Sequence, residues 1–375
     1  MSNSQPDSTE SNPSSISDPI ASLSGSERGA SKRLKPVNLV VGLAVLGIIA
    51  ALGATVLGLF GIGGNQIEHG NVTFDLSPDS KQVAFSSASG GLYALDLNTK
   101  TVTGLYNGKS VACFPKYSPD GKTIVFVGKD STRGQTSLYR IPALGGQDTL
   151  LATSDGASDF APSFSPDGKE VVFVRAARKR PYSMGGTVWD DFDIWMLDLS
   201  SGATRQITSQ KYRSASSPCF ADGGKSILYT ATVPGGSLAA QMFRVGEAKG
   251  SIPQPFMLPT SSNSVHGAWA SDLAVSKDGK HLVFLSDRAE AYAYDIFTSQ
   301  ANGENPVPLH FAQTSRYNRS PVFARDGASI YVLAGTESNA HGRPIYSLFR
   351  VDLKGKATCV ADGGLFTHPT SWKPN

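Results

Sequence analysis

The chain has 375 residues, more than one compact core usually holds unless the fold is built from repeats. Its formal net charge of +3 and its 17% of charged residues argue against nucleic-acid binding, which requires clustered cations. Three cysteines without CxxC spacing exclude a disulfide framework and a zinc finger. The 39 glycines and 22 prolines favour many short strands joined by turns.

Residues 1–36 are predicted to be a disordered, serine-rich cytoplasmic tail with a basic flank. Eleven serines and three prolines lie within 1–31, where large apolar side chains are almost absent. Such a composition cannot bury enough surface to offset the entropy lost on ordering. The basic flank consists of Arg28, Lys32, Arg33 and Lys35.

Residues 37–63 are predicted to form a transmembrane helix that acts as a signal-anchor. Leu39 to Ile62 is a run of 24 uncharged residues. As a helix it would span about 36 Å, enough for a hydrocarbon core of roughly 30 Å. The run is too long for a cleavable signal peptide and lacks a small-residue cleavage site. Because basic residues flank only its N-terminal end, we expect residues 64–375 to lie outside the cytoplasm.

A turn motif recurs along the remaining sequence at intervals of 41 to 56 residues. Proline presets φ, aspartate bonds its own backbone and glycine takes the left-handed position, so the motif closes a hairpin. The interval is close to that of a four-stranded propeller blade. The copies are SPDS at 77–80, SPDG at 118–121, SPDG at 165–168, ADGG at 221–224, SKDG at 276–279 and ARDG at 324–327.

Each turn is led by an apolar residue and followed by strands in register. Seven and nine residues after the leading residue come pairs such as Val171 and Phe173, which share one face of a strand. An apolar–aromatic pair such as Ile194 and Trp195 marks a third strand, and a weaker fourth strand follows. Units of this kind bury both faces only when they stack around a ring. The leading residues are Leu76, Tyr117, Phe164, Phe220, Val275 and Phe323.

These residues resemble the TolB-type β-propeller repeat, a relative of the WD repeat. The best match is PSFSPDGKEVVF at 162–173 together with DIWMLDL at 193–199. The resemblance covers about residues 71–375 and implies an all-β, six-bladed propeller of four-stranded blades over 64–375, after the membrane helix and the tail. HPTSWKPN at 368–375 reads as the first strand of another blade, so seven blades are an alternative; the same segment could instead pair with the first blade and fasten the ring. Three of the six turns lack the Ser-Pro pair, and the helical N-terminal domain of secreted TolB proteins is not found.

The resemblance implies that the connections between second and third strands share one face of the ring, opposite the SPDG turns. The longest connection lies between Phe173 and Trp195, and it mixes cations, aromatic rings and carboxylates. Such a loop suits an anionic or glycan-like ligand or a partner peptide; a solvated, self-paired loop is the alternative. The candidate binding residues in it are Arg175, Arg178, Lys179, Arg180, Tyr182, Trp189, Asp190 and Asp191. Asp159, Phe160, Asn318, Arg319 and His368 are expected to line the same mouth.

The sequence contains no motif that specifies a metal site, a cofactor or a catalytic centre. Asp190, Asp191 and Asp193 offer oxygen ligands for Ca²⁺, but no EF-hand spacing accompanies them. The histidines form no HExxH pair, and no GxSxG elbow stands outside the tail. We therefore predict no catalytic residue, no metal and no cofactor. The three cysteines are expected to be free and buried.

The function expected from these features is non-enzymatic recognition at the cell envelope. A membrane-tethered propeller would bind a protein or an envelope polymer through its loop-rich face, and no nucleic acid. One alternative is a cation-dependent lyase or a hydrolase in the channel mouth, where His266, His341 and His368 are the histidines within reach. Another is an extracytoplasmic sensor coupled to the serine-rich tail, for example through phosphorylation.

Overall fold

A computed structural model describes residues 72–371 except for 107, 109–110, 130–133, 182–186, 237–238, 257–268, 291–292, 312–317 and 339–343. The predicted tail, the predicted membrane segment and residues 372–375 lie outside the described residues. Within the described part of the sequence, no helix is long and apolar enough to cross a membrane.

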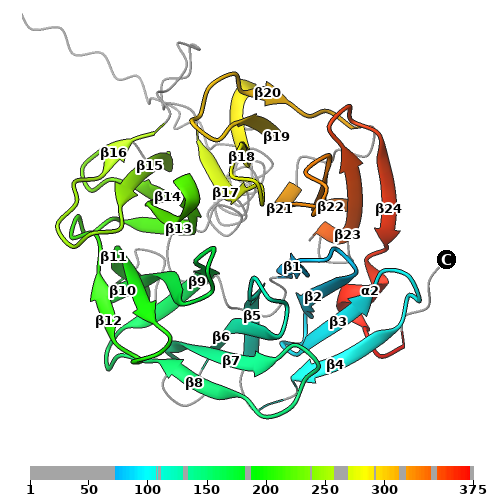
Figure 1. Cartoon of the computed structure of the whole chain (residues 1–375), viewed down its shortest axis with the longest axis horizontal. Helices are drawn as coiled ribbons and strands as arrows, with labels where there is room; N and C mark the ends of the chain where they lie inside the picture. Colours follow the sequence, from blue (N-terminus) through cyan, green and yellow to red (C-terminus); the bar gives the residue numbers. More distant parts are fainter. Residues whose placement is uncertain are drawn as a thin grey trace, which may run out of the picture. The chain divides into compact units, whose positions relative to one another are not determined.

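The described residues form six four-stranded antiparallel sheets around a ring, which confirms the six-bladed propeller and rules out a seventh blade within them (Figure 1). Blade 1 comprises β1 (Phe74–Leu76), β2 (Gln82–Ser86), β3 (Leu92–Asp96) and β4 (Val102–Tyr106). Blade 2 comprises β5 (Val111–Tyr117), β6 (Thr123–Lys129), β7 (Thr136–Pro142) and β8 (Thr149–Ala152). Blade 3 comprises β9 (Ser158–Phe164), β10 (Glu170–Pro181), β11 (Thr187–Asp198) and β12 (Thr204–Gln206).

The second half of the ring repeats this order, with two short helical turns added. Blade 4 comprises β13 (Ser214–Ala221), β14 (Ser226–Thr232), β15 (Gln241–Gly246) and β16 (Gln254–Pro255), with the 3-10 turn η1 (Asp222–Gly224) after β13. Blade 5 comprises β17 (Ala270–Val275), β18 (His281–Glu290), β19 (Ala293–Gln300) and β20 (Val307–Pro308). Blade 6 comprises β21 (Asn318–Phe323), β22 (Ser329–Ser338), β23 (Pro344–Asp352) and β24 (Ala357–Ala361), and helix α2 (Gly364–Thr367) follows.

The first strand of each blade is the innermost, and in five blades it carries a bulge at the same position. The bulged residues have φ between 46° and 52°, and each lies where the pairing with the second strand shifts register. In four of the blades a proline follows, which cannot donate a hydrogen bond to the ladder. The bulges turn these five residues toward the axis of the ring; they are Phe114, Ala161, Ser217, Asp272 and Ser320.

The turn after the first strand is closed by one repeated set of hydrogen bonds. In blade 2 the Ser118 hydroxyl donates to the Asp120 carboxylate at 2.6 Å and accepts from the Thr123 N–H at 3.0 Å. Gly121 has φ +72°, as the left-handed turn position requires. The serine hydrogen bond is the main cause that lowers the pKa of the turn aspartate. Blades 1, 3 and 5 repeat the set with Ser77, Ser165 and Ser276.

The core consists of aromatic pairs that join the second and third strands, as the repeat register predicts. Phe126 is fully buried and stacks on Tyr139 with ring centroids 5.6 Å apart. Equivalent stacked pairs lie in blades 1, 4 and 5 at 5.7 Å. Because these pairs lie between neighbouring sheets, burying them holds the blades in a ring.

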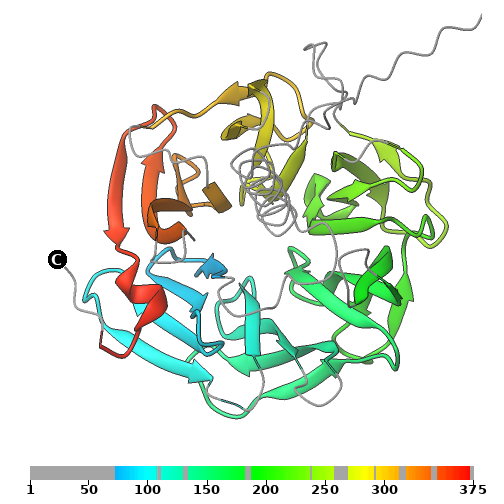
Figure 2. The ribbon, with the colours of Figure 1, turned by 180° about the vertical axis from the view of Figure 1, so that it is seen from behind.

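The ring is closed by helix α2 and not by a strand. Every blade is made of consecutive strands, so no sheet combines the two ends of the described part of the sequence. Phe366 of α2 is 2% exposed and packs edge-on against Phe85 at 5.3 Å, and its carbonyl accepts a hydrogen bond from the Ala88 N–H at 2.9 Å. Figure 2 shows α2 between the outer strands of blades 6 and 1. The strand expected at 368–375 is therefore wrong for residues 368–371, which form a turn.

Candidate functional site

The antiparallel order of the blades gives the ring two different faces. The turns between first and second strands, at 77–80, 118–121 and 165–168 for example, emerge on one side, here called the turn face. The connections between second and third strands, such as 87–91, emerge on the opposite side, here called the loop face. Binding residues on the two faces therefore belong to separate surfaces.

The long connection of blade 3 forms a strand ribbon on the loop face, and not an irregular loop. Both β10 and β11 have 12 residues, whereas β2 of blade 1 has 5. They remain paired out to Pro181 and Thr187, although β9 pairs with β10 only as far as Ala176. Residues 178–181 of β10 and 187–191 of β11, here called the ribbon, thus extend beyond their blade. Tyr182 lies outside the described residues.

Charged side chains on the ribbon are paired with one another across its two strands. The Arg178 Nη2 lies 3.0 Å from Asp190 Oδ2, and its Nε lies 2.9 Å from Asp191 Oδ2. Arg180 Nε lies 3.1 Å from the same Asp190 oxygen. The hydrogen bond from Arg178 is the main cause that lowers the pKa of Asp191. These two carboxylates hold both arginine side chains in place.

The apolar residue of the ribbon is covered by a lysine. The Lys179 ammonium lies 4.6 Å from the ring centroid of Trp189, within the range of a cation–π contact. Trp189 is only 6% exposed. The tryptophan therefore stiffens the ribbon, and Lys179 is the side chain that reaches solvent.

Two of the predicted site residues form an ion pair inside blade 3. Arg175 donates from Nε to Asp159 Oδ1 at 2.6 Å and from Nη2 to Oδ2 at 2.9 Å. Arg175 is 6% exposed and Asp159 is 1% exposed. The guanidinium also lies 5.1 Å from the Phe173 ring and 4.8 Å from the Trp195 ring. Burial raises the pKa of Asp159, and the hydrogen bonds from Arg175 oppose that shift.

The other predicted residues are distributed over different parts of the blades. Phe160 packs against Phe192 with centroids 6.0 Å apart. Asn318 and Arg319 line the central cavity, and the Arg319 guanidinium lies 5.3 Å from the Tyr346 ring. His368 ends helix α2 at the outside of the ring, so it is separate from the other candidates.

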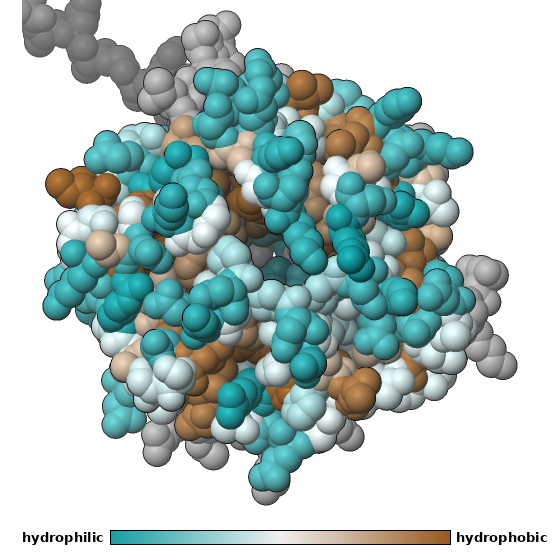
Figure 3. Space-filling view, in the orientation of Figure 1, coloured by the Kyte–Doolittle hydropathy of each residue, from teal (hydrophilic) through white to brown (hydrophobic). Residues whose placement is uncertain are grey.

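A cavity of about 1100 Å³ runs along the inner strands. Its wall is mainly apolar, with a Lys116–Asp75 ion pair at 3.3 Å and an Asp272 carboxylate that accepts from the Ser320 N–H at 3.0 Å. Figure 3 shows the ring hollowed at its centre, with hydrophilic residues around the opening. The volume suits a small ligand or a short peptide segment.

The rim of this cavity differs between the two halves of the ring. On the turn face, blades 1 to 3 place Pro78, Pro119 and Pro166 at the second position of the turn. Blades 4 to 6 place Asp222, Lys277 and Arg325 at that position, and all three are exposed. The asymmetry is visible in the sequence once the six turns are superposed, although none of these residues was among the predicted site residues.

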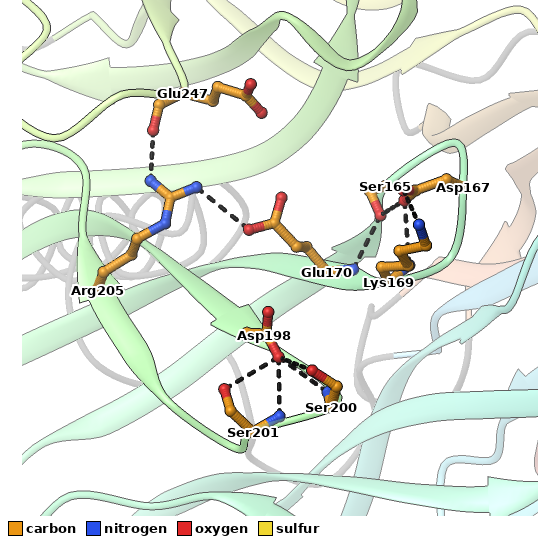
Figure 4. A network of polar contacts seen from close by, with 9 residues as sticks. All are labelled: Ser165, Asp167, Lys169, Glu170, Asp198, Ser200, Ser201, Arg205 and Glu247. Atoms are coloured by element: carbon orange, nitrogen blue, oxygen red, sulfur yellow. Dashed lines mark hydrogen bonds and ion pairs between the residues drawn. The ribbon is translucent and has the colours of Figure 1, made fainter.

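Polar contacts on the turn face also join neighbouring blades, as Figure 4 shows for blades 3 and 4. Arg205 of β12 donates to Glu170 of β10 at 3.2 Å and to the backbone carbonyl of Glu247 beyond β15. In the next turn Asp198 accepts hydrogen bonds from Ser200 and Ser201, which lower its pKa from the ordinary 3.8 to about 2. The contacts of Arg205 and Asp198 both hold the β11–β12 end of blade 3 in place.

No group of three or more His, Cys, Asp or Glu side chains gathers among the described residues in a way that could hold a metal ion. Asp193 accepts hydrogen bonds from Thr208 Oγ1 at 2.8 Å and from the Gln210 N–H at 2.9 Å, so it holds the loop after β12. The cysteines are free; Cys113 and Cys219 are buried as expected, whereas Cys359 is exposed.

The fold and turn chemistry define a six-bladed β-propeller whose blades carry complete or partial copies of a Ser-Pro-Asp-Gly turn. Residues 65–255, about half of the chain, match the family described as the TolB beta propeller domain. The chain belongs to this family.

Individual relatives match over short segments. A Tol-Pal system protein TolB from Francisella tularensis subsp. tularensis (strain SCHU S4 / Schu 4) is 34% identical over 77 residues. That segment is 20% of this chain and only 18% of the relative.

Solved structures share the fold at low sequence identity. TolB from Acinetobacter baumannii is 18% identical, with a TM-score of 0.55, and the match covers 75% of this chain and 63% of that one. An oligogalacturonate lyase in complex with manganese is also 18% identical, with a TM-score of 0.54, and the match covers 81% of both proteins. At this identity the likeness extends to the fold alone.

Proposed function

We propose that the protein is a non-enzymatic, protein-binding module of the cell envelope. Membership of the TolB propeller family supports this role, and the curated relative is described as part of a Tol-Pal system. We further propose that residues 37–63 anchor it in the membrane, with the tail in the cytoplasm and the propeller outside. A sensor coupled to the tail is a variant of the same proposal.

The observation that carries this proposal is the ribbon of β10 and β11. Beyond the edge of the blade it carries Arg178 and Arg180 on one face of β10 and Lys179 on the other, and Arg178 keeps 55% of its side chain exposed. The cross-strand carboxylates hold both arginines before a partner arrives, which lowers the ordering cost of binding. A protein segment or an envelope polymer with acidic groups would be attracted to this strand.

The remaining candidate residues have two different roles in this proposal. Arg319 and Asn318 would contact whatever enters the central cavity from the loop face. Asp159, Arg175, Phe160 and Trp189 would support the ribbon from within, because they are buried. The binding groups proper are then the ribbon cations, together with Tyr182 in the segment that joins β10 to β11.

The test is photocrosslinking in intact cells with a photoreactive amino acid at position 179. We expect a specific protein adduct, and the Arg178→Ala/Arg180→Ala variant should reduce its yield. A photoreactive residue at position 122, on the turn face, is the matched control and should not give that adduct. An unchanged adduct in the double variant would show that the ribbon is not the binding surface.

The enzymatic alternative is a cation-dependent lyase, and its support is the shared fold with the manganese-containing oligogalacturonate lyase. It predicts that the purified protein retains a divalent metal that is lost on replacing His266 or His368. Metal analysis that finds none would reject this form of the alternative.

A further inference from the structure

Three blades carry an arginine at the same position of the third strand. These residues are Arg140 of β7, Arg244 of β15 and Arg350 of β23. Arg244 lies 3.7 Å from Asp222, and Arg350 lies 3.0 Å from Asp326. In blades 4 and 6 the arginine therefore pairs with an aspartate in the turn of its own blade.

Arg140 lacks this partner. No acceptor within the described part of the sequence lies at hydrogen-bond or ion-pair distance from its guanidinium, and the side chain is exposed. Asp120, the counterpart of Asp326, is instead held by the Ser118 hydroxyl at 2.6 Å and by the Lys122 N–H at 3.0 Å. The position of Arg140 is thus equivalent, but both hydrogen bonds orient Asp120 through its Oδ1 atom and the carboxylate makes no contact with Arg140.

The residue that begins the turn explains the difference. Blade 2 has Ser118 at this position, whereas blades 4 and 6 have Ala221 and Ala324. Alanine has no hydroxyl, and in blades 4 and 6 the turn aspartate accepts instead from a serine of the second strand, Ser226 or Ser329. Ser118 therefore holds the Asp120 carboxylate in a different orientation, in which it does not contact Arg140.

Arg140 faces a groove of about 520 Å³ between blades 2 and 3. The groove lies on the turn face, and Leu151, Phe164 and Leu199 form its apolar wall. All three side chains are partly exposed. Arg140 beside this apolar wall is suited to a ligand in which a carboxylate and an apolar group lie next to each other.

The charges around the groove leave Arg140 as the surplus cation. Asp120 and Asp167 also line it, and each is followed two residues later by a lysine. Lys169 lies 3.8 Å from Asp167, and Lys122 helps to lower the pKa of Asp120. If each aspartate is counted against the lysine that follows it, the positive charge of Arg140 remains for a ligand.

We propose that this groove binds a peptide segment of a protein partner, with a carboxylate on Arg140 and an apolar side chain on Phe164. The carboxylate belongs to a peptide C-terminus or to an acidic side chain, because both present the same two oxygens to the guanidinium. The site is separate from the ribbon and does not depend on it, since the two lie on opposite faces.

The availability of Arg140 can be tested on the full-length protein with p-hydroxyphenylglyoxal, which reacts with accessible arginines, followed by peptide mass spectrometry. We expect Arg140 to react several-fold faster than Arg350. Ser118→Ala should release Asp120 to Arg140 and slow that reaction several-fold. Ser276→Ala is the matched control: it removes the same hydroxyl in blade 5, away from the groove, where Thr298 replaces the arginine. Equal rates at Arg140 and Arg350, or no effect of Ser118→Ala, would overturn the proposal.

Ligand binding is tested by protection of Arg140 from the same reagent. N-acetylphenylalanine should slow the modification, and its amide, which lacks the carboxylate, should not. N-acetyl-glutamyl-phenylalaninamide, which carries only a side-chain carboxylate, identifies which source of the carboxylate is preferred. Binding of a fluorescent form of the better probe should weaken about tenfold or more in Arg140→Ala, as expected for a charged hydrogen bond. Protection that is absent, or equal for acid and amide, would contradict the proposed ligand.

Discussion

Arg175 and Asp159 form a bidentate ion pair in the interior of blade 3, although both stand at positions where the sequence suggests contact with a ligand. The pair joins the inner strand β9 to β10 just before the ribbon begins. Its guanidinium lies against the rings of Phe173 and Trp195, so water is excluded from it. The pair therefore fixes the base of the ribbon.

Removing one member of this pair should destabilise the propeller strongly. Arg175→Ala leaves the Asp159 carboxylate buried without a cation, which is expected to cost about 3–5 kcal/mol of unfolding free energy. Because burial raises the pKa of Asp159, the loss of stability in Arg175→Ala should become smaller as the pH falls from 7 toward about 4, where the buried carboxyl is protonated and no longer leaves an unpaired charge. Urea unfolding at pH 7 and pH 4 measures both effects. Arg178→Ala removes a half-exposed arginine and leaves Asp190 paired with Arg180, so it should change stability less; equal losses in the two variants would contradict this account.

The seam between blades 6 and 1 should depend on Phe366. Phe366→Ala opens a cavity against Phe85 and is expected to cost about 3–5 kcal/mol. Chemical denaturation followed by tryptophan fluorescence gives the value. Leu353→Ala, at a residue 40% exposed, is the control and should be close to neutral. A Phe366→Ala variant as stable as the control would show that α2 does not close the ring.

Acid should destabilise the turn face through Asp198. Its folded pKa of about 2 lies below the ordinary 3.8, so the carboxylate contributes stability at pH values above about 4 and loses it as the pH falls toward 2. Asp198→Asn should flatten the dependence of the melting temperature on pH within this window. Asp155→Asn, at an exposed aspartate elsewhere in blade 3, serves as a comparison. If the melting temperature fell with pH equally steeply in the wild type and in Asp198→Asn, Asp198 would not be the group responsible.

The glycine of the repeated turn should be sensitive to replacement. Gly168 has φ +72°, and alanine in this conformation is expected to cost about 1–2 kcal/mol. An added Cβ would lie 3.4 Å from the Pro119 ring of the preceding blade, an ordinary contact, so the cost should come from the backbone alone. Thermal unfolding measures it. Gly168→Asn, which tolerates this conformation better, should recover part of the loss.

The repeated turn made most of the fold predictable from sequence. Superposing the six turns places every leading residue, and the aromatic of the second strand follows nine positions later, as Phe173 does after Phe164. The closing element was harder, because α2 has only four residues and its buried Phe366 contacts the first blade, which is far away in the sequence. A local pattern carries no information about such a contact.

Site residues were less predictable because their partners depend on side-chain geometry. Asp159 and Arg175 look like binding groups until the register of β9 and β10 places them opposite each other. Arg140 does not stand out in the sequence, since its availability follows from Ser118, which lies in the preceding turn of the same blade. A comparison of the blades reveals the difference, because blades 4 and 6 have an alanine at the position that Ser118 occupies in blade 2.

Closure by α2 also determines the order in which the ring can be completed during synthesis. Blades made of consecutive strands can form one after another as the polypeptide emerges, but Phe85 lacks the cover of Phe366 until residues 364–367 are made. A polypeptide that stops before Gly364 would retain all six sheets and still expose an apolar edge on the first of them. Until α2 is in place, the apolar surface around Phe85 would be open to aggregation or to a protease.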